Sequence, residues 1–129
     1  MMSTAANKAI MHRVFEEGLN QGRLEVVDEL FSTRFVDHST PEQVAGAKGV
    51  KEYFAAVRGG FPDIRVSIED MVAEGEKVVV RTTWRGTHMR TYDGVPAAGR
   101  WVARTMIQIF RIVNGKIEEE WNEGESLLN

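Results

Sequence analysis

The chain has 129 residues, of which 43% are hydrophobic and 27% charged, and its formal net charge is −3. A folded chain of this length buries roughly two-thirds of its unfolded surface, so it has room for a core and a ligand cavity. Cysteine is absent, which excludes disulfides, thiolate metal sites and a cysteine nucleophile. The basic residues are scattered along the chain, which argues against binding to nucleic acid or to an acidic membrane surface.

The sequence shows no targeting or membrane segment. Residues 1–8 lack the basic-then-apolar order of a signal peptide, and no apolar stretch approaches the roughly 18 residues that a membrane span needs. With three prolines and no low-complexity stretch, the chain offers no linker at which to divide it. We therefore expect a cytoplasmic protein with one domain over residues 1–129 and with no membrane or nucleic-acid partner.

The first half of the chain predicts three helices. Apolar residues recur at spacings of three and four from Thr4 to Leu19, and again over a shorter segment from Leu24 to Phe31. A third helix is predicted from about Ala47 to Arg58, with Gly59-Gly60 closing it. The short segment Phe35–His38, between the second and third helices, reads as extended.

The second half predicts a meander of strands, because the period of the apolar residues changes from helical to alternating after Pro62. The expected strands cover residues 64–69, 77–86, 101–112 and 116–122. Helices that are segregated from an antiparallel meander define an α+β fold. A single curved sheet wrapped against three helices leaves a cavity between the two layers, where we expect a hydrophobic small molecule to bind.

Asn114-Gly115 predicts a two-residue hairpin turn, because both central residues of a type I′ turn need a positive φ. Counting from that turn sets the register of the last two strands. The resulting pairs are Val113 with Lys116, Ile112 with Ile117, Arg111 with Glu118, Phe110 with Glu119, Ile109 with Glu120, Gln108 with Trp121, and Ile107 with Asn122. Both faces then mix apolar and polar groups, so one should line the cavity and the other should contact a second copy in a homodimer.

Glu120 is the candidate catalytic group. In this register it lies among isoleucines, which disfavour the anion and raise the pKa towards the range of a general acid or base. The alternative interpretation is a solvated acidic edge formed by Glu118–Glu120, and we favour that interpretation for Glu118 and Glu119.

Two histidines are secondary candidates. His38 follows Asp37 and could be oriented by that carboxylate, although adjacent residues on a strand point to opposite faces. His88 falls where a strand gives way to a loop, a solvated rim position with a lesser chance of touching a ligand. No spacing of histidines and carboxylates predicts a metal site.

Aromatic residues cluster in the predicted sheet and allow an apolar pocket for a ring-shaped ligand. They are Trp84, Trp101, Phe110 and Trp121. Aromatic side chains in strands are core residues first, so the alternative is that they only pack the interior.

Taken in order along nearly the whole chain, several short motifs resemble the SnoaL-like polyketide cyclases, also described as ester cyclases, of the nuclear-transport-factor-2-like superfamily. These motifs are Phe35-Val36-Asp37-His38, Gly49-Val50-Lys51, Phe61-Pro62-Asp63, Trp84-Arg85-Gly86-Thr87-His88, Gly94-Val95-Pro96-Ala97-Ala98-Gly99, Ile109-Phe110-Arg111-Ile112, Asn114-Gly115-Lys116-Ile117 and Glu119-Glu120-Trp121. The resemblance implies a cone-shaped α+β barrel, a cavity without cofactor, and commonly a homodimer packed through the outer face of the sheet.

The resemblance also implies ring closure by intramolecular aldol condensation, with a carboxylate on the last strand as acid/base and histidines nearby. His38 and His88 match histidine positions of the family. A frequent family pattern on the last strand is Glu-His-Trp-Asp, whereas this chain has Glu119-Glu120-Trp121-Asn122. Because asparagine cannot take a proton, either Glu120 has assumed the acid/base role or cyclase chemistry has been lost.

The leading hypothesis is a cofactor-free enzyme that performs proton transfer on a hydrophobic carbonyl compound. Glu120 is the acid/base, His38 its partner, and Asn122 a hydrogen-bond donor to the developing enolate oxygen. The predicted ligand contacts are His88, Trp84, Trp101 and Phe110. The alternatives are a non-catalytic ligand-binding dimer, or an isomerase, dehydratase or epoxide hydrolase on the same fold; the last of these would need an Asp-Arg-Asp constellation.

Overall fold

The computed structural model describes residues 3–128 and confirms the α+β class. The helices are α1 (Thr4–Arg13), η1 (Val14–Asn20), α2 (Glu25–Leu30) and α3 (Ala47–Gly60). The strands are β1 (Phe31–Asp37), β2 (Arg65–Glu74), β3 (Lys77–Thr87), β4 (Trp101–Val113) and β5 (Lys116–Gly124). No helix among the described residues is long and apolar enough to cross a membrane.

The predicted first helix forms, but its second half has the wider turns of a π-helix. The Ser3 side chain caps α1 by accepting a hydrogen bond from the Ala6 amide at 3.0 Å. The wide turns of η1 begin at Val14, and the side chains of Val14 and Phe15 line the cavity described below. At the end of η1, the Asn20 side chain bonds both the amide and the carbonyl of Val66 at 2.8 and 2.9 Å, which ties the helix to β2.

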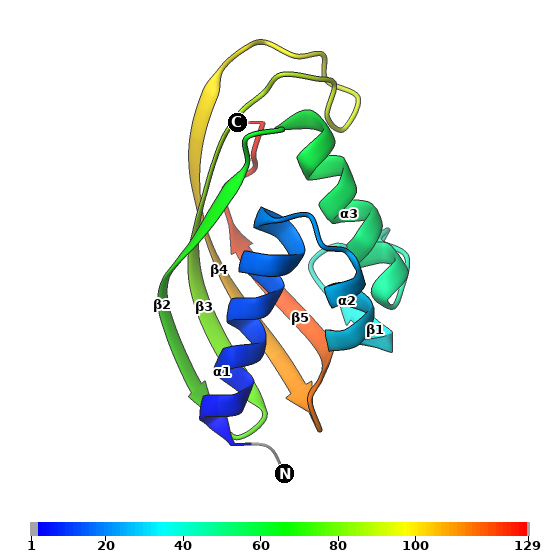
Figure 1. The fold of residues 1–129 in the computed structure, drawn as a ribbon, viewed down its shortest axis with the longest axis vertical. Coiled ribbons are helices and arrows are strands. Elements are labelled where there is room, and N and C mark those ends of the chain that lie inside the picture. The colour runs from blue at the N-terminus through cyan, green and yellow to red at the C-terminus, as the bar shows by residue number, and fades with distance from the viewer. Residues whose placement is uncertain (1–2, 129) are drawn as a thin grey trace.

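The third helix covers the cavity as predicted and buries Val50, Phe54 and Val57. The second helix is shorter than predicted, because Phe31 begins β1 instead of ending α2. The Phe31 ring is buried and packs edge-on against the Phe35 ring, with a centroid distance of 4.9 Å. The three helices all lie on one side of the sheet (Figure 1).

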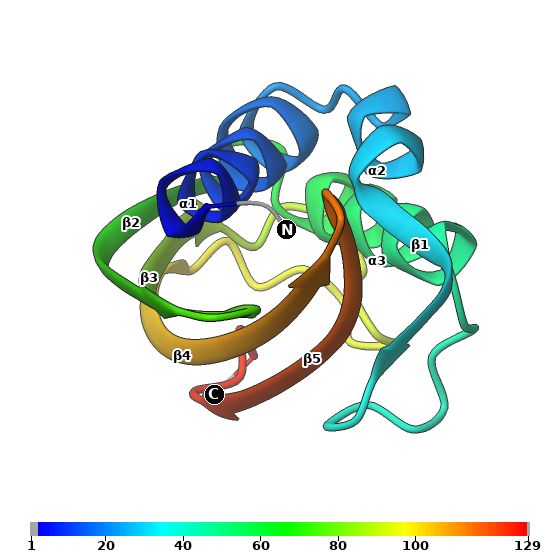
Figure 2. The same cartoon turned by 90° about the horizontal axis from the view of Figure 1, so that it is seen from below.

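The sheet has the strand order β1-β5-β4-β3-β2, in which β1 runs parallel to β5 and the other pairs are antiparallel. Seen from below, the sheet curls around the helices that cover its concave side (Figure 2). The expected cone-shaped barrel of a mostly antiparallel sheet wrapped on three helices is therefore confirmed.

The predicted register of the last hairpin is correct at the turn and wrong beyond it. Val113 pairs with Lys116 and Ile112 with Ile117, but the next pair is Arg111 with Glu119. The extra residue forms a β-bulge, which shifts every later pair by one and bends the strand. The later pairs include Phe110 with Glu120, Ile109 with Trp121, and Gln108 with Asn122. The turn residues therefore fix only the first two pairs, because the bulge lies beyond them.

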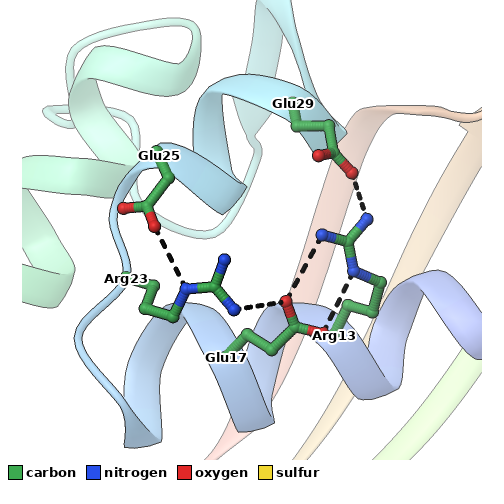
Figure 3. Close-up of polar contacts among 5 residues, drawn as sticks. All are labelled: Arg13, Glu17, Arg23, Glu25 and Glu29. Atoms are coloured by element: carbon green, nitrogen blue, oxygen red, sulfur yellow. Dashed lines mark hydrogen bonds and ion pairs between the residues drawn. The ribbon is translucent and has the colours of Figure 1, made fainter.

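An exposed network of ion pairs joins the first helical segment to α2 (Figure 3). Arg13 bonds Glu17 at 3.1 Å and also contacts Glu29, while Arg23 bonds Glu17 at 3.2 Å and Glu25 at 3.1 Å. Water and salt screen exposed ion pairs, so the network contributes far less to stability than the burial of the apolar core does.

Candidate active site

A cavity of about 180 Å³ lies between the inner face of the sheet and the helices. Its apolar wall consists of Val14, Phe15, Phe31, Val50, Phe54, Trp84, Met106 and Phe110. Its polar groups are Asp37, Thr40, Gln43, Tyr53, Gln108, Glu120 and Asn122. The cavity therefore presents a few polar groups on an apolar wall, which is the usual composition of a small-molecule site.

Glu120 projects into this cavity from β5, opposite Phe110. Its Oε2 atom accepts hydrogen bonds from the side-chain amides of Gln108 at 3.1 Å and Asn122 at 3.2 Å. Burial, and secondarily the negative charge of Asp37, raise the pKa of Glu120 to about 8, although the two amides act in the opposite direction. Glu120 is therefore mostly protonated at neutral pH, so its resting form is that of a general acid.

A chain of hydrogen bonds behind the carboxyl group orients the Gln108 amide. The Trp84 indole donates to Thr82 Oγ1 at 3.0 Å, and the Thr82 hydroxyl donates to Gln108 Oε1 at 3.1 Å. Thr82 and Gln108 are both buried, so these bonds are shielded from water. With its oxygen engaged by Thr82, Gln108 presents its NH₂ group to Glu120.

Asp37 is the second carboxyl group of the cavity and stands beside Glu120 in the parallel pairing of β1 with β5. The Asn122 Nδ2 atom lies 3.3 Å from both Asp37 carboxylate oxygens and thus bridges the two acids. Ser39 holds the end of β1 in place, because its amide bonds Asp37 Oδ1 at 2.9 Å and its hydroxyl bonds the Asn122 backbone. Sequence reasoning treated Asp37 only as a partner of His38.

Tyr53 is a further polar group of the cavity, to which the sequence analysis assigns no role. It projects from α3 into the cavity, with its ring 6.4 Å from that of Trp84. Burial and the neighbouring Tyr92, Glu120 and Asp37 raise the pKa of the Tyr53 hydroxyl. The hydroxyl therefore stays protonated and can donate a hydrogen bond to a ligand.

The predicted partnership of His38 with the Glu120 side chain is wrong. His38 Nε2 lies 3.0 Å from Glu119 Oε1, and its ring stacks on Trp121 with a centroid distance of 5.0 Å. Asp37, one residue earlier, lines the cavity instead. Alternation along β1 is the reason, since neighbouring strand residues point to opposite faces.

Two predicted ligand contacts also lie elsewhere. His88 is buried, not solvated, and stacks on Phe61 at 5.1 Å, but it does not line the cavity. Trp101 begins β4 with its side chain on the outer side of the sheet and is 63% exposed. Trp84 and Phe110 do line the cavity, as do Glu120 and Asn122.

The role predicted for Asn122 does not match its contacts. Its Nδ2 atom, expected to donate to an enolate oxygen, is engaged by the carboxyl groups of Asp37 and Glu120. Asn122 is thus a positioning residue that holds two acids on either side of one amide. Within residues 3–128, no group of three or more histidine or acidic side chains is arranged to hold a metal ion.

A curved, mostly antiparallel sheet wrapped on three helices, with a cavity between the two layers, is the nuclear-transport-factor-2-like fold. Residues 9–127 match the family described as SnoaL-like polyketide cyclase, and the chain therefore belongs to that family. No curated protein matches it.

Solved structures share this fold over nearly the whole chain. TsrD from Streptomyces laurentii has a TM-score of 0.89 at 24% identity, with 97% of this chain and 92% of that chain covered. IdmH from Streptomyces antibioticus, described as a candidate polyketide cyclase, has a TM-score of 0.78 at 28% identity over 92% and 91% of the two chains. AclR from Streptomyces galilaeus, described as a candidate hydroxylase, has a TM-score of 0.82 at 24% identity over 95% and 91%. The names of these similar structures thus refer to more than one type of reaction.

Proposed function

We propose that this protein catalyses cofactor-free acid/base chemistry, an aldol-type cyclisation or a related proton transfer, on a hydrophobic carbonyl compound bound in the cavity. One observation carries the proposal: two carboxyl groups, Asp37 and Glu120, flank the Asn122 amide in an apolar cavity. The raised pKa of Glu120 gives the pair a proton donor at neutral pH, and Asp37 supplies the negative charge that contributes to that rise. An acid beside a base is the arrangement that enolisation needs.

In the proposed reaction, Asp37 removes the proton from the carbon next to a carbonyl group while Glu120 gives its proton to the oxygen of that carbonyl, so the electron pair of the C–H bond forms the double bond of an enol. The enol carbon attacks a second carbonyl carbon of the same molecule, the enol proton returns to Glu120 as the first carbonyl forms again, and Asp37 gives its proton to the oxygen that becomes a hydroxyl. Tyr53 donates a hydrogen bond to the oxygen of the first carbonyl, the role that Asn122 cannot fill. The product is an isomer of the substrate, and both carboxyl groups return to their starting protonation states.

The proposal is tested by following deuterium uptake from heavy water at the α-carbon of hydrophobic aryl ketones by NMR. The parent protein should accelerate the exchange, because enolisation alone is sufficient for it and no complete substrate is needed. A protein that binds these ketones without accelerating exchange would contradict the proposal. That result would favour the non-catalytic ligand-binding alternative, which Asn122 supports by standing where the family pattern has a proton-carrying aspartate.

Replacing Asp37 by Asn is expected to lower the exchange rate by roughly 10²- to 10⁴-fold, since the amide keeps the shape of the side chain but accepts no proton. The matched control is Asp70→Asn, which removes an exposed carboxylate bonded to Arg81 at 3.1 Å outside the cavity. The control should exchange like the parent. Equal rates in all three proteins would exclude Asp37 as the base.

The epoxide hydrolase alternative is not supported by the cavity. Its described lining contains two carboxyl groups but no arginine, so the Asp-Arg-Asp constellation is not formed.

The expected homodimer also remains a proposal, and the outer face of the sheet supports it. An apolar row crosses four strands there, because Val72 pairs with Val79, Val79 with Ile109, and Ile109 with Trp121. Val72, at one end of the row, is 62% exposed. A contiguous apolar surface of this kind is typical of an interface between copies of a chain.

Light scattering at micromolar concentration should therefore give a dimer for the parent and a monomer for Ile109→Lys, which places a charge in the middle of the row. Met89→Lys is the control, since Met89 is an exposed apolar residue outside the strands. A monomeric parent would overturn the proposed dimer.

A further inference from the structure

A second cavity of about 140 Å³ adjoins the first. Three side chains, Tyr53, Trp84 and Met106, line both cavities and therefore lie between them; we call these three residues the neck. We call the second cavity the far compartment; its wall also includes Tyr92, Arg104 and Leu127. A ligand that passes between the neck residues would extend from the carboxyl pair towards the C-terminal segment.

Arg104 supplies the positive charge of the far compartment. It lies on the inner face of β4, paired with Trp84 on β3, and its guanidinium donates to the Ser126 carbonyl at 3.0 Å. The guanidinium also donates to the Ala103 carbonyl at 3.3 Å. Both acceptors are neutral carbonyl oxygens, so these two bonds hold the guanidinium in place without neutralising its positive charge.

Two acidic residues also line the far compartment, but neither pairs with Arg104 among the described residues. Glu125 Oε1 is bonded to the Thr105 hydroxyl at 2.9 Å, on the side of β4 opposite Arg104. Asp93 is exposed in the loop that follows β3. Within residues 3–128, Arg104 forms no ion pair. The other arginines of β3 and β4 do bond acidic or hydroxyl side chains: Arg81 bonds Asp70, Arg85 bonds Ser67 and Arg111 bonds Glu76.

The two ends of the combined cavity therefore differ in charge. Asp37 gives the near end its negative charge, whereas Arg104 gives the far end a positive group, because the Glu125 carboxylate there is bonded to Thr105 and Asp93 is exposed. Arg104, Met106 and Gln108 follow one another on the inner face of β4, so Arg104 and Gln108 are about 13 Å apart along the strand. An anionic group on a ligand is repelled at the near end and attracted at the far end.

We propose that the far compartment binds the carboxylate tail of an elongated, otherwise apolar substrate, with Arg104 holding the tail and the neck residues Tyr53, Trp84 and Met106 contacting the chain. The carboxylate at Arg104 places the opposite end of the ligand at Asp37 and Glu120, which orients the reacting carbonyl. The inference takes from the proposed function only that the substrate occupies this cavity, and it names the class of substrate as an apolar keto acid.

Equilibrium binding of two unreactive probes, octanoate and octan-1-ol, tests the inference by calorimetry. The probes share one chain and differ only in the charge of the head group. A hydrogen-bonded contact with a charged partner is worth about 1.5–3 kcal/mol, so octanoate should bind roughly 10- to 100-fold more tightly than octan-1-ol. Because neither probe reacts, the result is independent of whether the acid/base chemistry occurs.

Arg104→Gln should weaken octanoate binding by roughly 10-fold or more and leave octan-1-ol binding within about twofold of the parent. The matched control is Arg85→Gln, which removes the same charge from the residue next to Trp84, where Arg85 bonds Ser67 at 3.2 Å outside both cavities. Arg85→Gln should bind both probes like the parent.

Octanoate binding that is no tighter than octan-1-ol binding in the parent overturns the inference without any variant. Equal losses in Arg104→Gln and Arg85→Gln overturn it as well, because they would reflect net charge and not a site. If Arg104→Gln does not fold, Arg104→Lys replaces it in the test, because Lys keeps the positive charge on a shorter side chain. Arg104→Lys should still prefer octanoate to octan-1-ol, but by a smaller factor. Complete loss of octan-1-ol binding in Arg104→Lys would contradict the proposed site.

Discussion

Replacing Glu120 by Gln is expected to lower the rate of proton transfer by roughly 10²- to 10⁴-fold with the fold intact. Gln keeps the volume of the side chain, and its carbonyl oxygen can still accept the hydrogen bonds that Gln108 and Asn122 donate to Oε2. The change removes only the titrating proton. The α-carbon exchange of a ketone in heavy water, measured beside a melting curve, gives the rate and the stability in the same preparation.

Glu119→Gln is the matched control, because it makes the same chemical change one residue earlier on β5. Glu119 lies outside the cavity, where it contacts Arg111 and bonds His38 at 3.0 Å. The control should keep the parent rate, since neighbouring strand residues point to opposite faces. If Glu120→Gln exchanged as fast as Glu119→Gln, Glu120 would not be the catalyst.

The pH dependence separates an acid from a base. If Glu120 donates a proton, kcat/KM of the parent should fall as the pH rises through about 8, the value to which burial raises its pKa. If Glu120 accepted a proton, kcat/KM would instead rise over the same interval. Either limb should disappear in Glu120→Gln, whose side chain does not titrate.

The sequence predicts the elements of this fold because most of them are encoded locally. The helical spacing before Gly60, the alternation after Pro62 and the Asn114-Gly115 turn each act over a few residues, and the structure places helices, strands and the turn there. Asn114 and Gly115 do adopt positive φ values of 49° and 80°, as a type I′ turn requires. Local chemistry therefore suffices for the α+β class and the order of elements.

The site depends on contacts that no local pattern encodes. Glu120 was predicted to lie among isoleucines, yet it faces Phe110, because a bulge after Ile117 shifts the register. Burial raises the pKa of Glu120, as predicted, but the residues that surround the carboxyl group differ from the predicted isoleucines. The pairing of β1 with β5 joins residues more than 80 positions apart in sequence, such as Asn122 and Asp37, and only that pairing makes Asp37 a neighbour of Glu120.

One signal for Asp37 was nevertheless present in the sequence. Strand alternation requires Asp37 and His38 to point to opposite faces, so only one of them can share the cavity with Glu120. Phe35, the buried apolar residue two positions before Asp37, lies on the same face of β1 as Asp37. Extending that alternation along the strand selects Asp37 for the interior and His38 for the outer face, as the structure shows.

The free energy of unfolding of the parent, relative to that of Glu120→Gln, is expected to decrease as the pH rises from about 5 to about 8. The native pKa of Glu120, about 8, exceeds its ordinary value of 4.5. Between those values the unfolded chain loses this proton while the folded chain keeps it, so ionisation stabilises the unfolded state. The stabilising contribution of Glu120 is full below its unfolded pKa and is lost progressively until the pH passes the folded pKa.

The slope of this loss is at most about 1.4 kcal/mol per pH unit, so the difference between the two proteins should grow to several kcal/mol across the interval. Urea unfolding of both proteins at about pH 5, 6, 7 and 8 measures it, and taking the difference cancels every other titrating group. Glu119→Gln again serves as the control: hydrogen bonds from Arg111 and His38 lower the pKa of Glu119, so its contribution changes only at more acidic pH. If the free energies of unfolding of the parent and of Glu120→Gln changed in parallel from pH 5 to 8, Glu120 would ionise freely in the folded protein. That result would contradict the assignment of Glu120 as a protonated acid at neutral pH.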